Sequence, residues 1–257
     1  MKKITYPLLF LVLLCLSSCF DVDEQYDFKA NGTIDFAYNI DLGKTVTVFT
    51  GMMPDSSKKK DKQYNAVVDT TLNFYTAAGD ITQKRMNPEE TYLAKNSNIK
   101  VNMNLSKGVM KAGITLNAKS AADIDYFLRN LSKMPSLDKK LGEVTKDDKK
   151  SVDTTGARGL MEYENFYSYE ITAHKFYRTI DTAKFGPFSR KNVQTVEMAK
   201  GLKMTIPYKL TLNFASPVKN VSSSIAKVSA DKKRVTLETD MEAMSKNPSI
   251  LNLKVDY

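Results

Sequence analysis

The sequence has no tryptophan, one histidine and two cysteines among its 257 residues. Both cysteines, Cys15 and Cys19, lie near the start, so the rest of the chain can form no disulfide and must rely on a hydrophobic core. His174 alone cannot complete a zinc site, because zinc ions in proteins take three or four His, Cys or acidic ligands. The absence of tryptophan also removes the side chain that stacks best on sugars.

The motifs of common active sites are missing too. No glycine-rich phosphate loop occurs among the 11 glycines, and no GxSxG elbow accompanies His174, which falls in a strand-like run. Glu89-Glu90 and Asp147-Asp148 are neighbours in polar stretches, whereas acid–base catalysis needs carboxylates that face each other across a cleft. We therefore expect no catalytic residue, no metal ion and no cofactor.

The formal charge is +9, which can accompany binding to nucleic acid, anionic lipid or acidic glycan. Here the lysines are interleaved with acids, as in the runs 58–62 and 146–150. Mixed runs of this kind are typical of solvated loops, so we expect no nucleic-acid partner.

The first nineteen residues are the most informative part of the chain. Lys2 and Lys3 precede the thirteen apolar residues Ile4–Leu16, which as a helix would reach roughly 20 Å, short of the ~30 Å hydrocarbon core. A positive head, a short apolar middle and a small-residue exit are typical of a secretory signal peptide.

The exit, Leu16-Ser17-Ser18-Cys19, resembles the lipobox of bacterial lipoproteins. That resemblance implies removal of residues 1–18 as a signal peptide and acylation of Cys19, with palmitate among the acyl chains, as a membrane anchor. Two or more acyl chains hold a protein stably on a bilayer. Cys15 lacks the preceding residues that a lipobox requires, so Cys19 is the expected anchor. The alternative to a lipoprotein signal is an ordinary signal peptide that happens to contain a cysteine.

An acidic stretch follows, and we expect residues 19–26 to form a tether. Asp21, Asp23 and Glu24 resemble the surface-export signal of Bacteroidota lipoproteins, whereas Asp21 alone also resembles the inner-membrane retention signal of enterobacterial ones. A third interpretation is a merely solvated linker, since acids repel an anionic membrane. The expected location is the outer membrane, lipid-anchored, with the domain either exposed at the cell surface or facing the periplasm.

Alternating apolar residues predict strands over 28–48, with a turn at Asn31-Gly32, over the hairpin 98–116, and over 202–214 and 251–257. Pro207 suggests an edge strand or a bulge in the third of these. Ser120, with Asp123 three residues on, begins a predicted helix. The pattern indicates an α+β fold, largely antiparallel sheet with a few short helices.

We expect residues 27–257 to form the α+β domain, with an internal boundary that could fall in the charged loop 136–159. The segments YKLTLNFASPVKNV, SADKKRVTLETDM and NPSILNLKVDY, together with NGTIDFAYNID, resemble the module of LppM-type envelope proteins. This resemblance implies binding of lipid or envelope glycan and carries over no individual residue.

Aromatic residues are concentrated between Tyr163 and Phe188. If exposed, Phe166, Tyr167, Tyr169 and Phe176 could line a ligand site. The alternative, which we favour for the tyrosines, is that these aromatics form the core face of one strand, with Phe166 and Phe176 turned to the surface.

Three Asp-Thr-Thr/Ala triplets resemble the O-glycosylation sequon of exported Bacteroidota proteins, with Thr70, Thr154 and Thr182 as the acceptors. Taken together, the sequence predicts an envelope lipoprotein of Bacteroidota type whose domain is a non-enzymatic binding or accessory module, for lipid or glycan. The alternatives are a structural partner in an envelope protein complex and a hydrolase with an unrecognised site.

Overall fold

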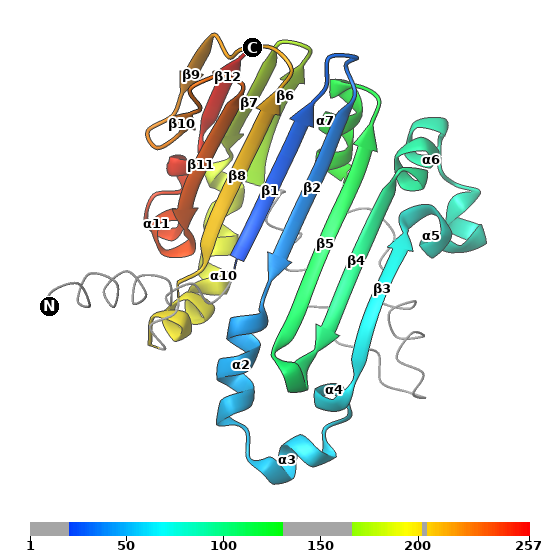
Figure 1. Cartoon of the computed structure of the whole chain (residues 1–257), viewed down its shortest axis with the longest axis vertical. Coiled ribbons are helices and arrows are strands. Elements are labelled where there is room, and N and C mark those ends of the chain that lie inside the picture. The colour runs from blue at the N-terminus through cyan, green and yellow to red at the C-terminus, as the bar shows by residue number, and fades with distance from the viewer. Residues whose placement is uncertain (1–20, 131–165, 202–204) are drawn as a thin grey trace, which may run out of the picture.

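The computed structural model describes residues 21–130, 166–201 and 205–257, which form two β-sheets and a set of helices (Figure 1). The large sheet has the strand order β10-β11-β8-β1-β2-β5-β4-β3, and the small one β6-β7-β12-β9. The strands are β1 (Asp21–Phe28), β2 (Ile34–Asp41), β3 (Val67–Asn73), β4 (Ser97–Asn104), β5 (Val109–Ala118), β6 (Tyr167–Thr172), β7 (Lys175–Ile180), β8 (Pro207–Phe214), β9 (Asn220–Ser222), β10 (Lys227–Val228), β11 (Arg234–Asp240) and β12 (Leu253–Asp256). The predicted α+β class is confirmed.

Period-two patterning explains the large sheet. In β1, β2 and β8 the buried side chains alternate with exposed or half-buried ones along almost every residue. The β1–β2 hairpin closes through the predicted turn, where Gly32 has φ 84° and the Asn31 carboxamide oxygen accepts from the Thr33 N–H. Gly32 suits this site because a positive φ strains residues that carry a Cβ.

Strand β8 joins the C-terminal half of the chain to the N-terminal half. It pairs in parallel with β1 and antiparallel with β11, so it lies inside the sheet. The prediction of an edge strand or bulge at Pro207 is therefore wrong. Proline fits because it is the first residue of β8, a position where a missing N–H does little harm.

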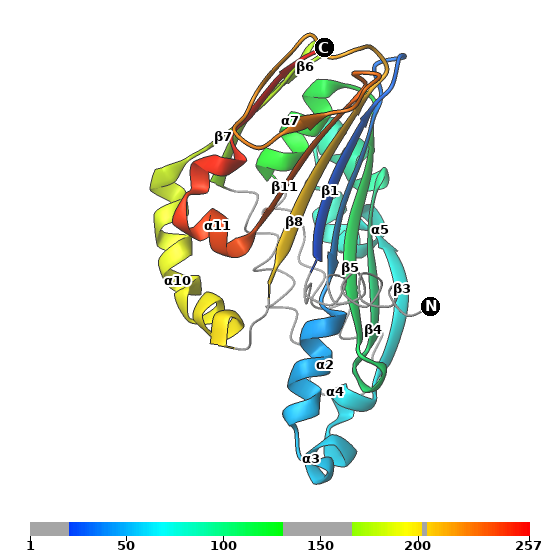
Figure 2. The same ribbon diagram turned by 60° about the vertical axis from the view of Figure 1, so that its left-hand side comes forward.

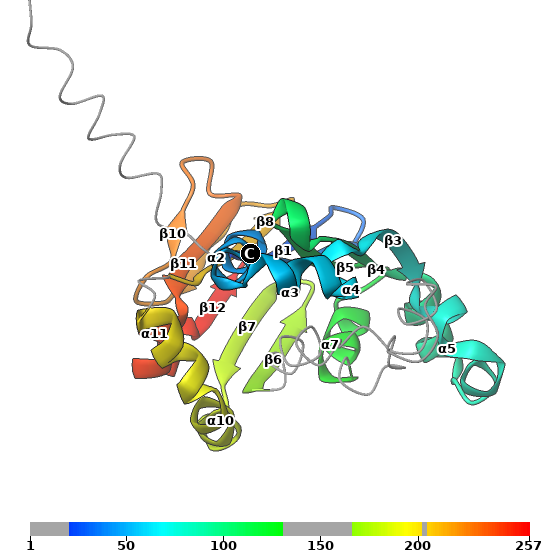
Figure 3. The ribbon, with the colours of Figure 1, turned by 90° about the horizontal axis from the view of Figure 1, so that it is seen from below.

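The two sheets share one hydrophobic core, with the small sheet and most helices on one face of the large sheet (Figure 3). Side chains from β1, β2 and β8 meet others from β7 and β12, and Phe28 stacks on Phe214 with ring centroids 4.9 Å apart. The opposite face of the large sheet is polar. Its outward residues are mostly Asp, Asn, Lys and Thr.

The helices are α2 (Gly43–Met52), α3 (Asp55–Lys60), α4 (Lys62–Asn65), α5 (Phe74–Gln83), α6 (Pro88–Lys95), α7 (Ala121–Asn130), α10 (Thr182–Gly201) and α11 (Met241–Lys246), with 3₁₀ turns η1 (Leu105–Lys107) and η4 (Pro248–Leu251). Helix α7 begins as predicted, because the Ser120 hydroxyl accepts from the Asp123 N–H at 3.2 Å. The Asp123 carboxylate in turn accepts from the Lys119 N–H at 2.9 Å. In the described part of the chain, no helix combines the length and apolarity needed to cross a bilayer.

Helix α2 corrects the prediction of a strand that continues to Val48. The β4–β5 turn, with Gly108 at φ 67°, ends the sheet beside Asp41, which pairs with Lys111. Leu42 still donates its N–H to the Met110 carbonyl at 2.8 Å, and the residues from Gly43 onward leave the sheet just before that turn. Helical hydrogen bonds satisfy their backbone groups instead.

Candidate functional site

The predicted acidic tether is already part of the fold from Asp21 onward. Residues Asp21–Phe28 form β1, a central strand, so any tether ends before Asp21. Asp21 is exposed, Asp23 is half-buried and Glu24 is fully buried. The three acids proposed as an export signal therefore do not form one surface cluster in the folded domain.

Glu24 belongs to a polar network between the two sheets. One of its carboxylate oxygens lies 3.0 Å from Arg178 Nη1 and also accepts from the Tyr208 hydroxyl, while Tyr26 donates to the other. Arg178 donates from Nε to the Leu251 carbonyl as well. Both charged side chains have no exposed surface, so the network belongs to the core.

The aromatic residues proposed as ligand contacts are also in the core. Phe166, Tyr167 and Tyr169 are each at most 8 % exposed, and Phe176 is completely buried. The expectation that Phe166 and Phe176 face the surface is wrong. In the β6–β7 hairpin Ile171 pairs with Phe176, so inward positions are odd in β6 and even in β7.

The remaining predicted residues are scattered. Thr70 lies half-buried on β3, Thr182 is exposed at the start of α10, and Cys19 and Thr154 lie outside the described residues. His174 is exposed in the turn between β6 and β7.

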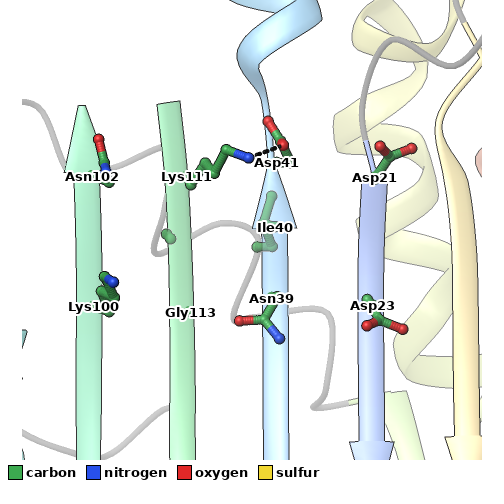
Figure 4. Close-up of a pocket in the computed structure, with 10 residues that line it drawn as sticks. Asp21, Asp23, Asn39, Ile40, Asp41, Lys100, Asn102, Lys111 and Gly113 are labelled. Atoms are coloured by element: carbon green, nitrogen blue, oxygen red, sulfur yellow. Dashed lines mark ion pairs between the residues drawn. The ribbon is translucent and has the colours of Figure 1, made fainter. Parts of the chain in front are cut away.

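A hollow of about 400 Å³ opens instead on the polar face of the large sheet (Figure 4). Strand register arranges its outward side chains as two rows across β1, β2, β5 and β4. The first row is Asp23, Asn39, Gly113 and Lys100, and the second is Asp21, Asp41, Lys111 and Asn102.

Gly113 forms the floor of the first row. It pairs with Asn39 on one side and Lys100 on the other, and it has no side chain to fill the space between them. A Cβ at this position would lie 2.5 Å from the Asn39 carboxamide oxygen, which is closer than real Cβ atoms come to their neighbours. The Asn39 side chain therefore takes the space that a side chain at position 113 would need.

The hollow has mixed charge. Lys111 Nζ lies 2.8 Å from the Asp41 carboxylate, whose other oxygen accepts from the Gly43 N–H at 2.9 Å. Burial alone would raise the pKa of Asp41, but these bonds outweigh it and hold that pKa below its usual value.

Asp23 behaves in the opposite way. Burial raises the pKa of Asp23, and neighbouring Glu24 adds to this, although the charge of Lys209 on β8 opposes the shift. Three carboxylates and two ammonium groups line the hollow, so it presents donors and acceptors in near balance.

Sequence reasoning did not identify Asn39, Asp41, Lys100, Lys111 or Gly113 as site residues. The available signal was their place at the polar positions of alternating strands.

In the part of the chain that the structure covers, no cluster of three or more His, Cys, Asp or Glu residues could hold a metal ion. Side chains of this kind can bind a polar ligand through many hydrogen bonds.

Comparisons with known proteins identify no family. No protein-family model matches the sequence, and no curated protein matches it. Among solved structures, the folded domain of Mycobacterium tuberculosis LppM aligns over 93 % of this chain and 90 % of its own, with 8 % identity and a TM-score of 0.37. A similarity this weak carries no argument about function.

Proposed function

We propose that the chain is a lipid-anchored lipoprotein of the bacterial cell envelope. Its domain would be a non-enzymatic binding module that holds a hydroxyl-rich ligand, such as a glycan, in the hollow. The anchoring half of this proposal is supported by the apolar run Ile4–Leu16 and the lipobox-like exit to Cys19. The binding half is supported by the hollow.

The single observation that carries the binding proposal is the pair of polar rows around Gly113. Glycan hydroxyls both donate and accept hydrogen bonds, and the rows supply both partners. Near-balanced charge fits a neutral polar ligand better than a strong anion or cation. The buried positions of Tyr167, Tyr169 and Phe176 count against an aromatic-lined lipid site.

The same arrangement argues against hydrolysis. Asp41 is committed to Lys111 and the Gly43 N–H, so it is poorly placed to exchange a proton with a substrate. The hollow opens on the polar face of the large sheet, whereas catalytic sites gain from excluding water. We therefore propose binding without cleavage.

A glycan array probed with the purified chain tests the proposal. We expect binding to defined oligosaccharides that is lost in Gly113→Gln, which fills the hollow. Thr115→Gln is the matched control, since Thr115 is the next outward residue on β5 and lies outside the hollow. Absence of glycan binding, equal loss in both variants, or cleavage of the bound oligosaccharide would contradict the proposal.

A second candidate function is favoured by β3. Within the described residues this strand has one sheet neighbour, β4, and Val67 at its start is 71 % exposed. Such an edge can add a partner's strand to the sheet. A photo-crosslinker at Val67 should then capture one envelope protein in cells, whereas the same group at exposed Thr115, which is paired with strands on both sides, should not.

A further inference from the structure

Helix α2 is packed in an unusual way, because none of its ten residues is buried although many are apolar. Two small residues of the helix contact the β4–β5 turn. Gly43 and Thr47 lie against Gly108 of the β4–β5 turn, so closely that a Cβ on Gly108 would collide with the Thr47 hydroxyl. Surface helices normally bury apolar side chains against the core, whereas α2 buries none.

Two large apolar side chains of α2 are exposed. Phe49 and Met52 are three residues apart, so they lie on the same side of the helix, whereas Val46 and Val48 are half-buried. Phe49 is 43 % exposed and Met52 is 61 % exposed. Two large apolar side chains on one outward face need a partner to cover them.

Lysines follow this apolar face directly. Lys58, Lys59 and Lys60 end α3, and the stretch 43–65 carries five lysines against two aspartates. Among the described side chains of this stretch, Lys58 Nζ lies 3.4 Å from Asp55, and Lys44, Lys59 and Lys60 form no ion pair. Apolar side chains beside a cluster of cations match the interface of an anionic bilayer.

The position of α2 in the fold points to the same partner. Asp21 pairs with Asp41, so the start of β1 and the start of α2 lie at the same end of the large sheet. Helices α2 and α3 project beyond this end (Figures 1 and 2). Only Phe20 lies between Cys19 and Asp21, and two residue steps span at most about 7 Å.

We propose that α2 and α3 dock on the surface of an anionic lipid bilayer, with Phe49 and Met52 in the interface and the lysines on the headgroups. The docking itself needs no acylation. Only the identity of the membrane rests on the proposed anchoring at Cys19. Docking would place one end of the large sheet at the bilayer, with its strands pointing away from the membrane. The hollow would then lie near the headgroups, because Asp41 is two residues before α2.

The absence of tryptophan provides a direct test. In a chain of residues 19–257 with Cys19→Ser, which keeps every described element and cannot be acylated, Phe49→Trp introduces a single tryptophan. With vesicles of phosphatidylethanolamine and phosphatidylglycerol, its fluorescence should shift to shorter wavelength and be quenched by brominated acyl chains. Ile81→Trp is the control, because Ile81 is 72 % exposed on α5, beyond the opposite end of β3.

The lysines are tested in the same assay. Replacing Lys58, Lys59 and Lys60 by glutamine should weaken vesicle binding by about tenfold to a hundredfold, and added salt should have a similar effect. The matched control replaces Lys227, Lys232 and Lys233, which are exposed on β10 and the turn before β11.

Three outcomes would overturn the proposal: no spectral change in Phe49→Trp on anionic vesicles, an equal change in Ile81→Trp, or a change without vesicles that grows with protein concentration. The last would assign the face to a second copy of the chain. Failure of acylation at Cys19 in cells would leave all three readouts unaffected, so the two proposals can fail separately.

Discussion

Glu24 and Arg178 are 154 residues apart in the sequence, yet they form an ion pair of 3.0 Å with no exposed surface on either side chain. The pair joins β1 of the large sheet to β7 of the small one. Charges taken out of water are tolerated only with close partners, and here Tyr26 and Tyr208 add hydrogen bonds, although Arg178 Nη2 has no hydrogen-bond partner among the described residues. The relative position of the sheets is thus fixed by polar as well as apolar contacts.

Removing one member of this pair should be costly. Glu24→Gln leaves the Arg178 guanidinium buried without a counter-charge, so we expect the free energy of unfolding to fall by about 3–5 kcal/mol. Urea unfolding of the purified chain measures this. The control is Asp35→Asn, which breaks the exposed Lys29–Asp35 pair and should cost at most about 1 kcal/mol. Similar costs for the two variants would contradict the buried network.

Phe176 provides a second test of the core. Because it is fully buried and contacts Tyr26 at a ring-centroid distance of 5.1 Å, Phe176→Ala should lower the free energy of unfolding by about 3–5 kcal/mol. Phe49→Ala removes the same atoms from an exposed helix and should change stability little. Thermal unfolding of both variants separates the two cases. An unchanged melting temperature in Phe176→Ala would restore the surface position predicted from the sequence.

The two aspartates of the hollow should respond to pH in opposite directions. The lowered pKa of Asp41 means that its ionised form stabilises the fold above its unfolded-state pKa, and that this contribution is lost as pH falls through the folded pKa. The raised pKa of Asp23 means that its contribution is present at low pH and is lost as pH rises through the folded pKa.

Near neutral pH, Asp41→Asn should therefore lower the free energy of unfolding, and Asp23→Asn should leave it unchanged or raise it. The Asp41 difference should be lost as the pH falls below about 4, and the Asp23 difference should develop as the pH rises above about 4, the ordinary pKa of aspartate. Carboxyl NMR titration of the wild type provides the direct check. An Asp23 that titrates below Asp41 would be incompatible with the described hollow.

The start of α7 offers a local test of helix capping. Ser120→Ala removes the acceptor for the Asp123 N–H and should reduce the free energy of unfolding by about 1 kcal/mol. Ser120→Asn, which can also cap, should restore most of the loss. An effect below 0.3 kcal/mol, by our rough estimate of the detectable limit, would show that the cap is not needed.

Local patterns predicted much of this fold. Alternation identified β2, the β4–β5 hairpin and most of β8, and the Ser120 cap identified α7. These elements could be predicted because the conformation of each depends mainly on residues close together in the sequence. The alternation of Thr45, Val46, Thr47 and Val48 failed, because the end of the sheet at Gly108 decides their conformation.

Long-range pairing explains the other errors. Glu24 resembled part of a tether because its partner, Arg178, lies in a distant strand. The hollow could not be foreseen for a similar reason, since it needs β1 and β2 beside β5 and β4, and only pairing fixes that order. The polar residues were visible in the sequence, but their two rows were not.

Acylation of Cys19 is the most direct test of the account. Cells that express the full chain are labelled with an alkyne analogue of palmitate, and the labelled protein is followed in membrane and soluble fractions. We expect label and membrane attachment in the wild type and in Cys15→Ser, and loss of the label in Cys19→Ser. If Cys19→Ser kept the label, or if the wild type never acquired it, the chain would not be a lipoprotein anchored at this residue.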